Sequence, residues 1–135
     1  MDLVKSMMAS ASGMKAQGER MRIIAENLAN ANSVGRNPDE APYRRKILTF
    51  RNVLNREQGV ELVEVGKVQS DKSDFRLRYD PGHPAANSKG YVRMPNVNSI
   101  IEMNDMREAQ RSYEANIRAV EAAKRMLMNT VDLLR

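Results

Sequence analysis

The side chains that could do chemistry in this sequence are few and scattered. His83 is the only histidine and there is no cysteine, so the chain offers a metal one imidazole and no thiolate. Zinc sites and non-haem iron sites need several such ligands in one place. Because His83 lies between Gly82 and Pro84, we interpret it as a turn residue. The sequence therefore predicts no metal site.

One short match to a catalytic pattern is Ser12-Gly13-Met14-Lys15, which has the S-x-x-K spacing of penicillin-binding enzymes. The companion motifs are missing, and 135 residues are too few for that fold. Glu61 with Glu64 and Glu102 with Asp105 are carboxylate pairs, but such pairs are more typical of a solvated face or of a helix N-terminus. The sequence has neither a P-loop nor a dinucleotide-binding glycine fingerprint. We expect no enzyme activity, no catalytic residue and no cofactor.

The net charge of +5 raises the question of a nucleic-acid partner. The excess lies in residues 33–95, where 12 basic side chains stand against 8 acidic ones, and it is spread along the segment. The run Phe75-Arg76-Leu77-Arg78-Tyr79 interleaves aromatic and basic residues as a single-strand platform does. A strand with one buried and one wet face produces the same letters. We therefore expect no nucleic-acid binding.

Proline and glycine divide the chain into three segments. All five prolines and five of the seven glycines lie between residues 33 and 95. Proline costs about 3 kcal/mol inside a helix and glycine about 1 kcal/mol. We therefore predict an α+β fold with an N-terminal helix in 1–33, a loop plus a small β-rich insert in 34–95, and a C-terminal helix in 96–135. The chain has no apolar run of 18 residues, so we expect no membrane insertion.

Both terminal segments carry an apolar stripe with alternating steps of three and four residues, which predicts coiled-coil-like packing. The N-terminal stripe comprises Val4, Met7, Ala11, Met14, Gly18, Met21, Ala25 and Leu28. The C-terminal stripe comprises Met103, Met106, Gln110, Tyr113, Ile117, Val120, Lys124, Leu127, Val131 and Leu134. The apolar members of these stripes are the predicted assembly residues. The small residues Ala11, Gly18 and Ala25 would let helix backbones approach closely.

Polar residues mark the expected helix ends. Asp2 can cap the first helix, and Asn30, Asn32 and Gly35 tolerate the left-handed conformation that ends many helices. For the second helix, Ser99 and Glu102 have the spacing of a capping box, while Asn96 or Asn98 could act as the cap instead.

The middle segment predicts short strands and turns. Residues 75–79 alternate strictly, 60–68 are rich in valine, and 45–53 form a third candidate strand. Asp80-Pro81-Gly82 has turn chemistry, because Pro81 presets φ at the first central position and Gly82 allows a positive φ at the second; Ser88-Lys89-Gly90 is a second turn signal.

Pairing the two terminal helices along their stripes would leave further apolar residues uncovered. These are Leu3, Met8, Ile23, Ile24, Ala119, Ala123, Met126 and Met128. Because burying one such large side chain contributes about 1.5–3 kcal/mol, the surplus favours contact with neighbouring molecules. A monomeric helical hairpin whose insert packs on the helices stays possible. If the surplus is covered only on assembly, the termini would order as the molecules assemble.

The architecture resembles the axial proteins of the bacterial flagellum, which form its rod, hook and filament. Asn27-Leu28-Ala29-Asn30-Ala31-Asn32-Ser33 resembles their N-terminal signature, although Ser33 or Val34 stands where threonine is usual. A longer resemblance to one rod protein runs from Tyr79 to Asn116. The motif positions are Asn27, Leu28, Asn30, Asn32, Pro81, Gly82, Pro84, Gly90, Tyr91, Pro95, Asn96, Tyr113 and Asn116. Residues 51–74 show no such match.

This resemblance implies a structural subunit of the proximal rod, which transmits torque from the rotary motor to the hook. Its partners would be other rod proteins, copies of itself, export-gate and basal-body components, and the flagellar type III export machinery. It would lie in the periplasm without a cleavable signal peptide, and no such signal is seen at the start of the sequence. No cofactor belongs to this family.

Two questions are left open by the sequence. Asn27, Asn30 and Asn32 would bond backbone groups where the chain leaves the helix, with Tyr113 and Asn116 doing similar work, or each asparagine is a plain helix cap. The rival functions are a cytoplasmic coiled-coil adaptor or chaperone and a basic nucleic-acid-binding module.

Overall fold

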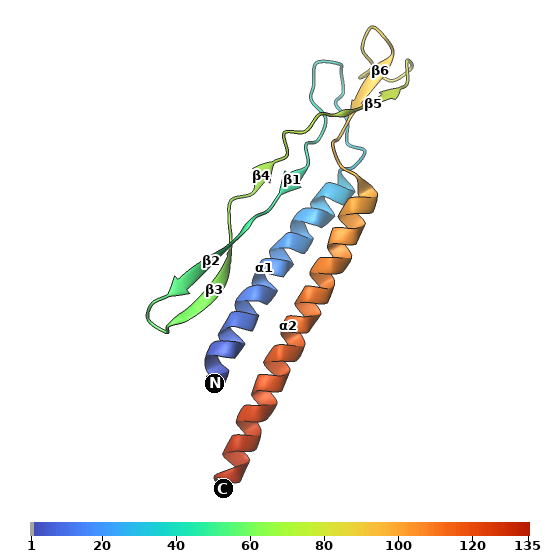
Figure 1. Ribbon diagram of the computed structural model, residues 1–135. Coiled ribbons are helices and arrows are strands. Elements are labelled where there is room, and N and C mark those ends of the chain that lie inside the picture. The colour runs from blue at the N-terminus through green and yellow to red at the C-terminus, as the bar shows by residue number, and fades with distance from the viewer. Residues whose placement is uncertain (1) are drawn as a thin grey trace. The chain divides into compact units, whose positions relative to one another are not determined.

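The computed structural model describes residues 2–135, which form two long helices and six short strands (Figure 1). The helices are α1 (Leu3–Ala29) and α2 (Ser99–Leu133). The strands between them are β1 (Lys46–Ile47), β2 (Phe50–Asn55), β3 (Val60–Val65), β4 (Gln69–Ser70), β5 (Arg76–Tyr79) and β6 (Tyr91–Met94). The predicted α+β fold, with terminal helices around a β-rich insert, is confirmed.

The strands form three separate antiparallel ribbons of two strands each. β1 pairs with β4, β2 with β3, and β5 with β6. The candidate strand at 60–68 contains β3, and the one at 75–79 contains β5. The candidate at 45–53 is split into β1 and the start of β2.

The chain forms two compact units, and both helices contribute to each. The first unit contains the chain up to Met21, Leu48–Lys67 and Arg107–Arg135. The second contains Arg22–Ile47 and Val68–Met106. Each unit is described below by itself.

The first unit has a very small core. Its fully buried apolar residues, among those the structure describes, are Ala16, Ala109 and Ala123. Gly13 lies against Asn116, because a Cβ added at Gly13 would be 3.0 Å from the Asn116 amide nitrogen. Small residues therefore let α1 and α2 pack closely here.

The second unit holds the larger buried side chains. Its buried apolar residues are Ile23, Ile24, Ala31, Ala85, Val92, Met94 and Val97. Ala85, Val92 and Met94 form one cluster, against which Val34 and Ala86 pack. β6 supplies the buried side chains of its ribbon, whereas all four residues of β5 are exposed. The expectation of a buried face on 75–79 is therefore wrong, because the core lies under β6.

The starts of both helices are capped as their sequence allows. The backbone N–H groups of Val4 and Lys5 donate to Asp2 Oδ1 at 3.0 and 3.3 Å, which confirms the first cap. At α2 the cap is Asn98, whose Oδ1 accepts from the N–H groups of Ile100 and Ile101 at 3.1 and 3.4 Å. Of the possible caps for α2, the structure selects Asn98.

The end of α1 differs from the prediction. Within residues 2–135 the only positive φ angles belong to Gly59 and Gly90, so Asn30, Asn32 and Gly35 do not adopt the left-handed conformation. The Asn30 side chain instead donates to the Glu26 carbonyl at 2.9 Å and satisfies the last turn directly. A left-handed ending is therefore not needed.

The turn after β5 is confirmed, but its glycine is not strained. The His83 N–H donates to the Asp80 carbonyl at 3.1 Å, which closes the turn. Gly82 does not adopt the positive φ that glycine allows, and a type I turn does not require it. In the second turn, Gly90 has φ +84°, and an added Cβ would lie 2.9 Å from the Tyr79 ring. Glycine is required at position 90.

Candidate functional site

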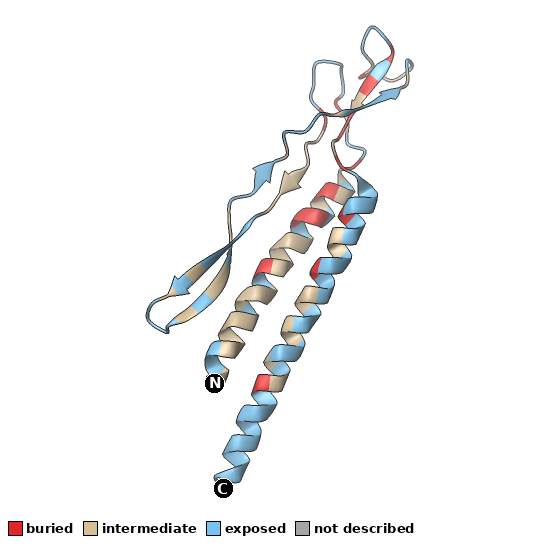
Figure 2. Cartoon of the chain, in the orientation of Figure 1, coloured by how far each residue is buried: buried red, intermediate tan, exposed pale blue. Residues whose placement is uncertain are grey.

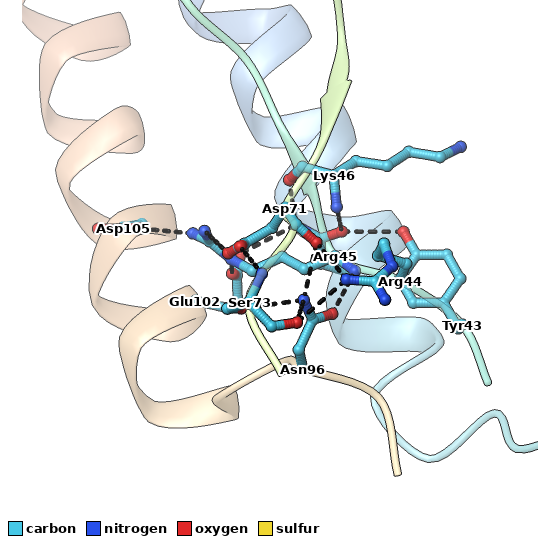
Figure 3. Close-up of polar contacts among 10 residues, drawn as sticks. Tyr43, Arg44, Arg45, Lys46, Asp71, Ser73, Asn96, Glu102 and Asp105 are labelled. Atoms are coloured by element: carbon cyan, nitrogen blue, oxygen red, sulfur yellow. Dashed lines mark hydrogen bonds and ion pairs between the residues drawn. The ribbon is translucent and has the colours of Figure 1, made fainter. Parts of the chain in front are cut away.

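A polar cluster joins the first turn of α2 to the end of α1 and to the chain around β1 and β4, all within the second unit (Figure 3). It consists of Glu26, Asn27, Tyr43, Arg44, Arg45, Lys46, Asp71, Ser73, Asn96, Glu102 and Asp105. Several of these residues are far apart in the sequence. Their contacts fix how β1 and β4 meet the two helices in this unit.

Glu102 and Arg45 form the central ion pair of the polar cluster. The Glu102 side chain is 1% exposed, and its Oε1 accepts a hydrogen bond from Arg45 Nε. The same guanidinium lies 3.3 Å from Asp71 Oδ2 and 3.9 Å from Asp105 Oδ2. In Figure 3, Glu102 and Asp105 reach from α2 towards Arg45. Three carboxylates thus share one cation, which offsets the cost of burying Glu102.

Asn27 binds the backbone of β1 as a neighbouring strand would. Its Nδ2 donates to the Lys46 carbonyl at 2.8 Å, and its Oδ1 accepts from the Lys46 N–H at 2.9 Å. Nδ2 also lies 3.3 Å from Glu102 Oε2, and Oδ1 accepts from the Tyr43 hydroxyl at 2.8 Å. Asn27 is therefore not a helix cap. It bonds the backbone of a distant segment.

Asn96 performs a similar role just before α2. Its Oδ1 accepts from the Arg45 N–H at 2.7 Å, while its Nδ2 donates to the Asp71 carbonyl at 3.0 Å. The Arg44 side chain donates to the carbonyls of Asp71 and Ser73 at 2.8 and 3.0 Å. The segments around β1 and β4 are thus tied together by side chains as well as by their short ladder.

Burial, hydrogen bonds and neighbouring charges shift three pKa values in the polar cluster. Burial alone would lower the pKa of Arg45, but hydrogen bonds and attraction from Glu102, and then Asp71, raise it. Hydrogen bonds from the backbone and side chain of Ser73 lower the pKa of Asp71. Burial, followed by repulsion from Glu26 and Glu102, raises the pKa of Tyr43. The shifted pKa values favour a charged Arg45, a charged Asp71 and a neutral Tyr43 phenol, as suits a structural joint.

The residues considered above as catalytic or metal-binding candidates make hydrogen bonds and ion pairs within the fold. His83 Nδ1 accepts from the Ala85 N–H at 3.0 Å, as expected of a turn residue. Ser12 Oγ donates to the Ala9 carbonyl and accepts from the Val63 N–H. Glu64 is paired with Arg51 at 2.9 Å. Residues 2–135 contain no cluster of three or more potential metal ligands. Neither α1 nor α2 is long and apolar enough to cross a membrane.

The N-terminal stripe lies outside the buried face of α1. None of its eight members is fully buried, and Val4, Ala11 and Ala25 are exposed. The buried residues of α1 are instead Ala16, Ile23, Ile24 and Asn27. The remaining members of the stripe, Met7, Met14, Gly18, Met21 and Leu28, are half-buried. No atom lies within 4 Å of a Cβ added at Gly18, so the helix is open there.

The C-terminal stripe is also outside the buried face, which carries Glu102, Ala109 and Ala123. Met106, Tyr113, Ile117 and Val120 are half-buried, whereas Met103, Gln110, Lys124, Leu127, Val131 and Leu134 are exposed. Every residue from Lys124 onward is exposed, as the pale blue end of α2 shows (Figure 2). We call residues 124–133 the C-terminal segment of α2. Its large apolar side chains include Met126, Leu127, Met128, Val131 and Leu133.

The motif positions have different roles. Asn27 and Asn96 belong to the polar cluster, Pro95 is buried, and Gly90 makes its turn possible. The Tyr91 ring lies edge-on to that of Tyr79, with centroids 5.3 Å apart. The other motif positions lie outside the polar cluster. Pro81, Gly82 and Pro84 lie in turns, Asn116 donates to the Ser112 carbonyl of its own helix, and Asn32 is exposed.

Sequence reasoning missed the residues that complete the polar cluster. Arg45 was visible as the start of the candidate strand 45–53 and as part of the densest basic run, Arg44-Arg45-Lys46, and neither indicated an ion pair with Glu102. Tyr43 was noted only within Pro42-Tyr43-Arg44-Arg45-Lys46, a segment similar to one in a rod protein, and Asp71 gave no signal. Hydrogen bonds between distant segments leave no periodic pattern. Glu102 was identified as a possible capping residue, but it binds Arg45 instead.

Two family models and several named proteins match the sequence of this chain. The sequence model of a family described as "Flagella basal body rod protein" matches residues 7–35, and one described as "Flagellar basal body rod FlgEFG protein C-terminal" matches residues 88–133. A protein of Agrobacterium fabrum named flagellar basal-body rod protein FlgC is 50% identical over 124 residues, covering 92% of this chain and 89% of its own. Proteins of the same name are 39% identical in Bacillus subtilis, over 95% of both chains, and 40% identical in Salmonella typhimurium, over 90% of both.

Proposed function

The chain belongs to the FlgC family of flagellar basal-body rod proteins, and on this premise we propose that it is a structural subunit of the proximal rod that transmits torque from the motor to the hook. In this proposal, the terminal helices of neighbouring subunits pack together along the N-terminal and C-terminal stripes. The subunit contributes no catalytic residue and no cofactor.

The observation that supports this proposal most is the exposure of apolar residues on α2. Leu127, Val131 and Leu134 repeat at steps of four and three residues and are 41%, 54% and 84% exposed. An apolar row with this spacing fits the seam of a helical bundle. No segment of residues 2–135 buries it, so the covering surface would come from other subunits. Each such side chain gains about 1.5–3 kcal/mol on burial.

Torque transmission requires a subunit that does not deform at its joints. The polar cluster supports such a role, because Arg45, Asn27 and Asn96 each bond two or more segments of the second unit. Directional bonds resist bending and twisting more than a loose apolar contact of the same size does. We propose that the polar cluster holds residues 34–47 and 68–95 in a fixed orientation on the helix ends of the second unit.

The partners and location follow from the proposed role. The subunit would contact copies of itself, other rod proteins and the export-gate and basal-body components. It would reach the periplasm through the flagellar type III export machinery, without a cleavable signal peptide. Membership of the rod protein family supports assembly with other rod components. We propose the contacts with export-gate and basal-body components in addition.

The test replaces stripe residues with a charge. Leu127→Asp or Ile117→Asp should abolish rod assembly and swimming while the protein is still expressed, because an unpaired carboxylate would be buried in the bundle. Ala115→Asp is the matched control, since Ala115 is exposed on α2 and lies outside both the stripe and the surplus apolar residues. Soft-agar motility and isolated basal bodies would be compared. Normal swimming of the Leu127→Asp strain would refute the assignment of the stripe.

A further inference from the structure

The outer edge of β2 carries backbone groups that have no partner. In the β2–β3 ribbon, the Val63 N–H points out of the ribbon and donates to Ser12 Oγ at 3.1 Å. The pair Asn52–Val63 therefore exchanges no backbone hydrogen bonds. By the alternation of an antiparallel ladder, the N–H and C=O groups of Phe50, Asn52 and Leu54 also point out of the ribbon, on the opposite side. Within residues 2–135, no hydrogen bond takes up these groups.

This edge is open because β3, and not β2, faces α1. Leu62 and Val63 of β3 line a hollow together with Ser12 and Ala16 of α1, and Figure 1 shows β2 on the far side of the ribbon. β2 also lacks the devices that usually protect a free edge. It has no proline and no lysine, and its one charge, Arg51, is paired with Glu64.

Two of the β2 residues with free backbone groups also have exposed apolar side chains. Phe50 and Leu54 are 39% and 56% exposed, and they lie on the same face of the strand because they are four residues apart. β5, in contrast, is an edge strand that carries Arg76 and Arg78 among only four residues. Of the two, β2 is therefore the edge that is suited to accept another strand.

We propose that β2 pairs in antiparallel fashion with β2 of a second copy of this chain, about a two-fold axis at Asn52. In this register Phe50 lies opposite Leu54 of the other copy, and Asn52 lies opposite its equivalent. The free N–H and C=O groups of both edges then meet each other. Arg51 lies opposite Val53, so no like charges face one another. The result is a four-stranded sheet in the order β3–β2–β2–β3.

This pairing would stabilise a weak element. A two-stranded ribbon is only marginally stable in water, whereas a sheet of three or more strands can stand alone. The contact involves one strand from each copy, so the dimer should be weak and concentration-dependent. A two-fold contact closes on itself and cannot extend a filament. If the proposed rod function holds, the paired form is therefore a state of the free subunit; the pairing itself does not depend on that function.

The absence of cysteine makes a direct test possible. In full-length Asn52→Cys, the two thiols would face each other across the two-fold axis, with Cα atoms about 5.5 Å apart. This separation suits a disulfide. We expect the oxidised dimer to form on the order of tenfold faster than in Glu61→Cys, because pairing raises the effective concentration of the thiols. Glu61 is exposed on β3 of the same ribbon and is the matched control. Equal rates for the two variants would overturn the proposal.

A mixture of single variants tests the register. Phe50→Cys mixed with Leu54→Cys should give mainly mixed disulfides. Each variant alone should cross-link slowly, since its own thiols would be about 13 Å apart along the strands. Preferential cross-linking of Phe50→Cys to itself would indicate parallel pairing and would contradict the two-fold arrangement.

A proline substitution tests the backbone bonds. Asn52→Pro removes an N–H that points away from β3, so the intramolecular ladder keeps its bonds, and proline is tolerated at such edge positions. We expect sedimentation equilibrium to show loss of the dimer while far-ultraviolet circular dichroism is unchanged. A dimer of undiminished affinity, or a wild-type chain that stays monomeric at millimolar concentration, would overturn the proposal.

Discussion

At its first turn, α2 contributes Glu102 to the polar cluster, where the carboxylate is 1% exposed and bound by Arg45 and Asn27. From Lys124 onward, the same helix has no buried residue, and Leu133 is 87% exposed. The beginning of α2 is thus rich in polar groups that are buried, and its end is rich in apolar groups that are exposed. In most folded proteins charged side chains are exposed and large apolar side chains are buried, so both ends of α2 show the reverse.

The difference separates two tasks. Buried polar groups cost free energy unless every partner is present, so the polar cluster specifies one arrangement of its segments. Exposed apolar groups favour burial by any complementary surface, so the C-terminal segment of α2 is suited to intermolecular contact. The chain's own fold is defined at one end of α2, and the proposed assembly contact is at the other.

The largest effect should come from breaking the central ion pair. Glu102→Ala leaves the Arg45 guanidinium without its closest partner and removes an acceptor from Asn27. We expect the free energy of unfolding to fall by about 4 kcal/mol, measured by urea denaturation followed by circular dichroism. Asp105→Ala is the control, because Asp105 is more exposed and lies 3.9 Å from Arg45. Similar losses in both variants would mean that the pair is not the centre of the polar cluster.

Asn27→Ala should have the next largest effect. The substitution leaves the Lys46 N–H and C=O, as well as the Tyr43 hydroxyl, without their partner. A loss of about 2 kcal/mol in the free energy of unfolding is expected. Asn32→Ala should be nearly neutral, since Asn32 is exposed. An equal effect at both positions would indicate that the asparagines act only as part of the helix end.

Gly90→Ala tests a neighbouring turn in the second unit. Alanine at φ +84° is strained, and its Cβ would lie 2.9 Å from the Tyr79 ring and 3.2 Å from Pro81 Cβ. We expect a loss of about 1.5 kcal/mol. Gly82→Ala provides the comparison, because Gly82 is not at positive φ and an added Cβ would meet nothing closer than 4.0 Å. A neutral Gly90→Ala variant would contradict the described turn.

A smaller effect should appear at alkaline pH. Burial, and then the charges of Glu26 and Glu102, raise the pKa of Tyr43 above its ordinary value of 10.0. In the unfolded chain the phenol ionises near pH 10, whereas in the folded chain it stays neutral. The stabilisation is therefore complete below pH 10 and is lost as the pH rises above it. Urea midpoints measured from pH 9 to 11 should fall less steeply for Tyr43→Phe than for the wild type; parallel curves would count against this.

The smallest effect on stability belongs to the other end of α2. Leu127→Asp should change the free energy of unfolding of the isolated chain by less than about 0.5 kcal/mol, because Leu127 is 41% exposed and packs on no buried core. Circular dichroism with urea denaturation would measure it. A large loss would show that the C-terminal segment is already covered in the free subunit, and the contrast between the two ends would disappear.

The helices and most strands were predictable because they depend on local signals. All five prolines and five of the seven glycines lie in residues 33–95, and the two long helices, Leu3–Ala29 and Ser99–Leu133, lie on either side of that segment. The cap at Asp2 was recognised from its position alone. Such signals act over one turn of chain, so a single sequence contains them.

The buried faces of the helices were not predictable in the same way. A heptad of large apolar residues indicates which face can be buried, but the residues buried on α2 are Glu102, Ala109 and Ala123. Alanines and a glutamate do not raise the hydrophobicity of a stripe. The polar cluster was missed for a related reason, since Arg45 and Asp71 are joined only by tertiary structure. Whether the predicted stripes serve assembly stays a prediction.

The contact of Gly13 with Asn116 affects how α2 can slide along α1 within the first unit. Asn116 lies where Gly13 of α1 has no side chain, since an added Cβ would be 3.0 Å from its amide nitrogen; the residues about one turn away, Ala9 and Gln17, both carry a side chain. Sliding α2 by one turn, about 5.4 Å, would force the amide against such a side chain. Gly13 thus provides the one position, among these three on α1, where Asn116 meets no side chain. The contact therefore favours one longitudinal register of α2 on α1 in this unit.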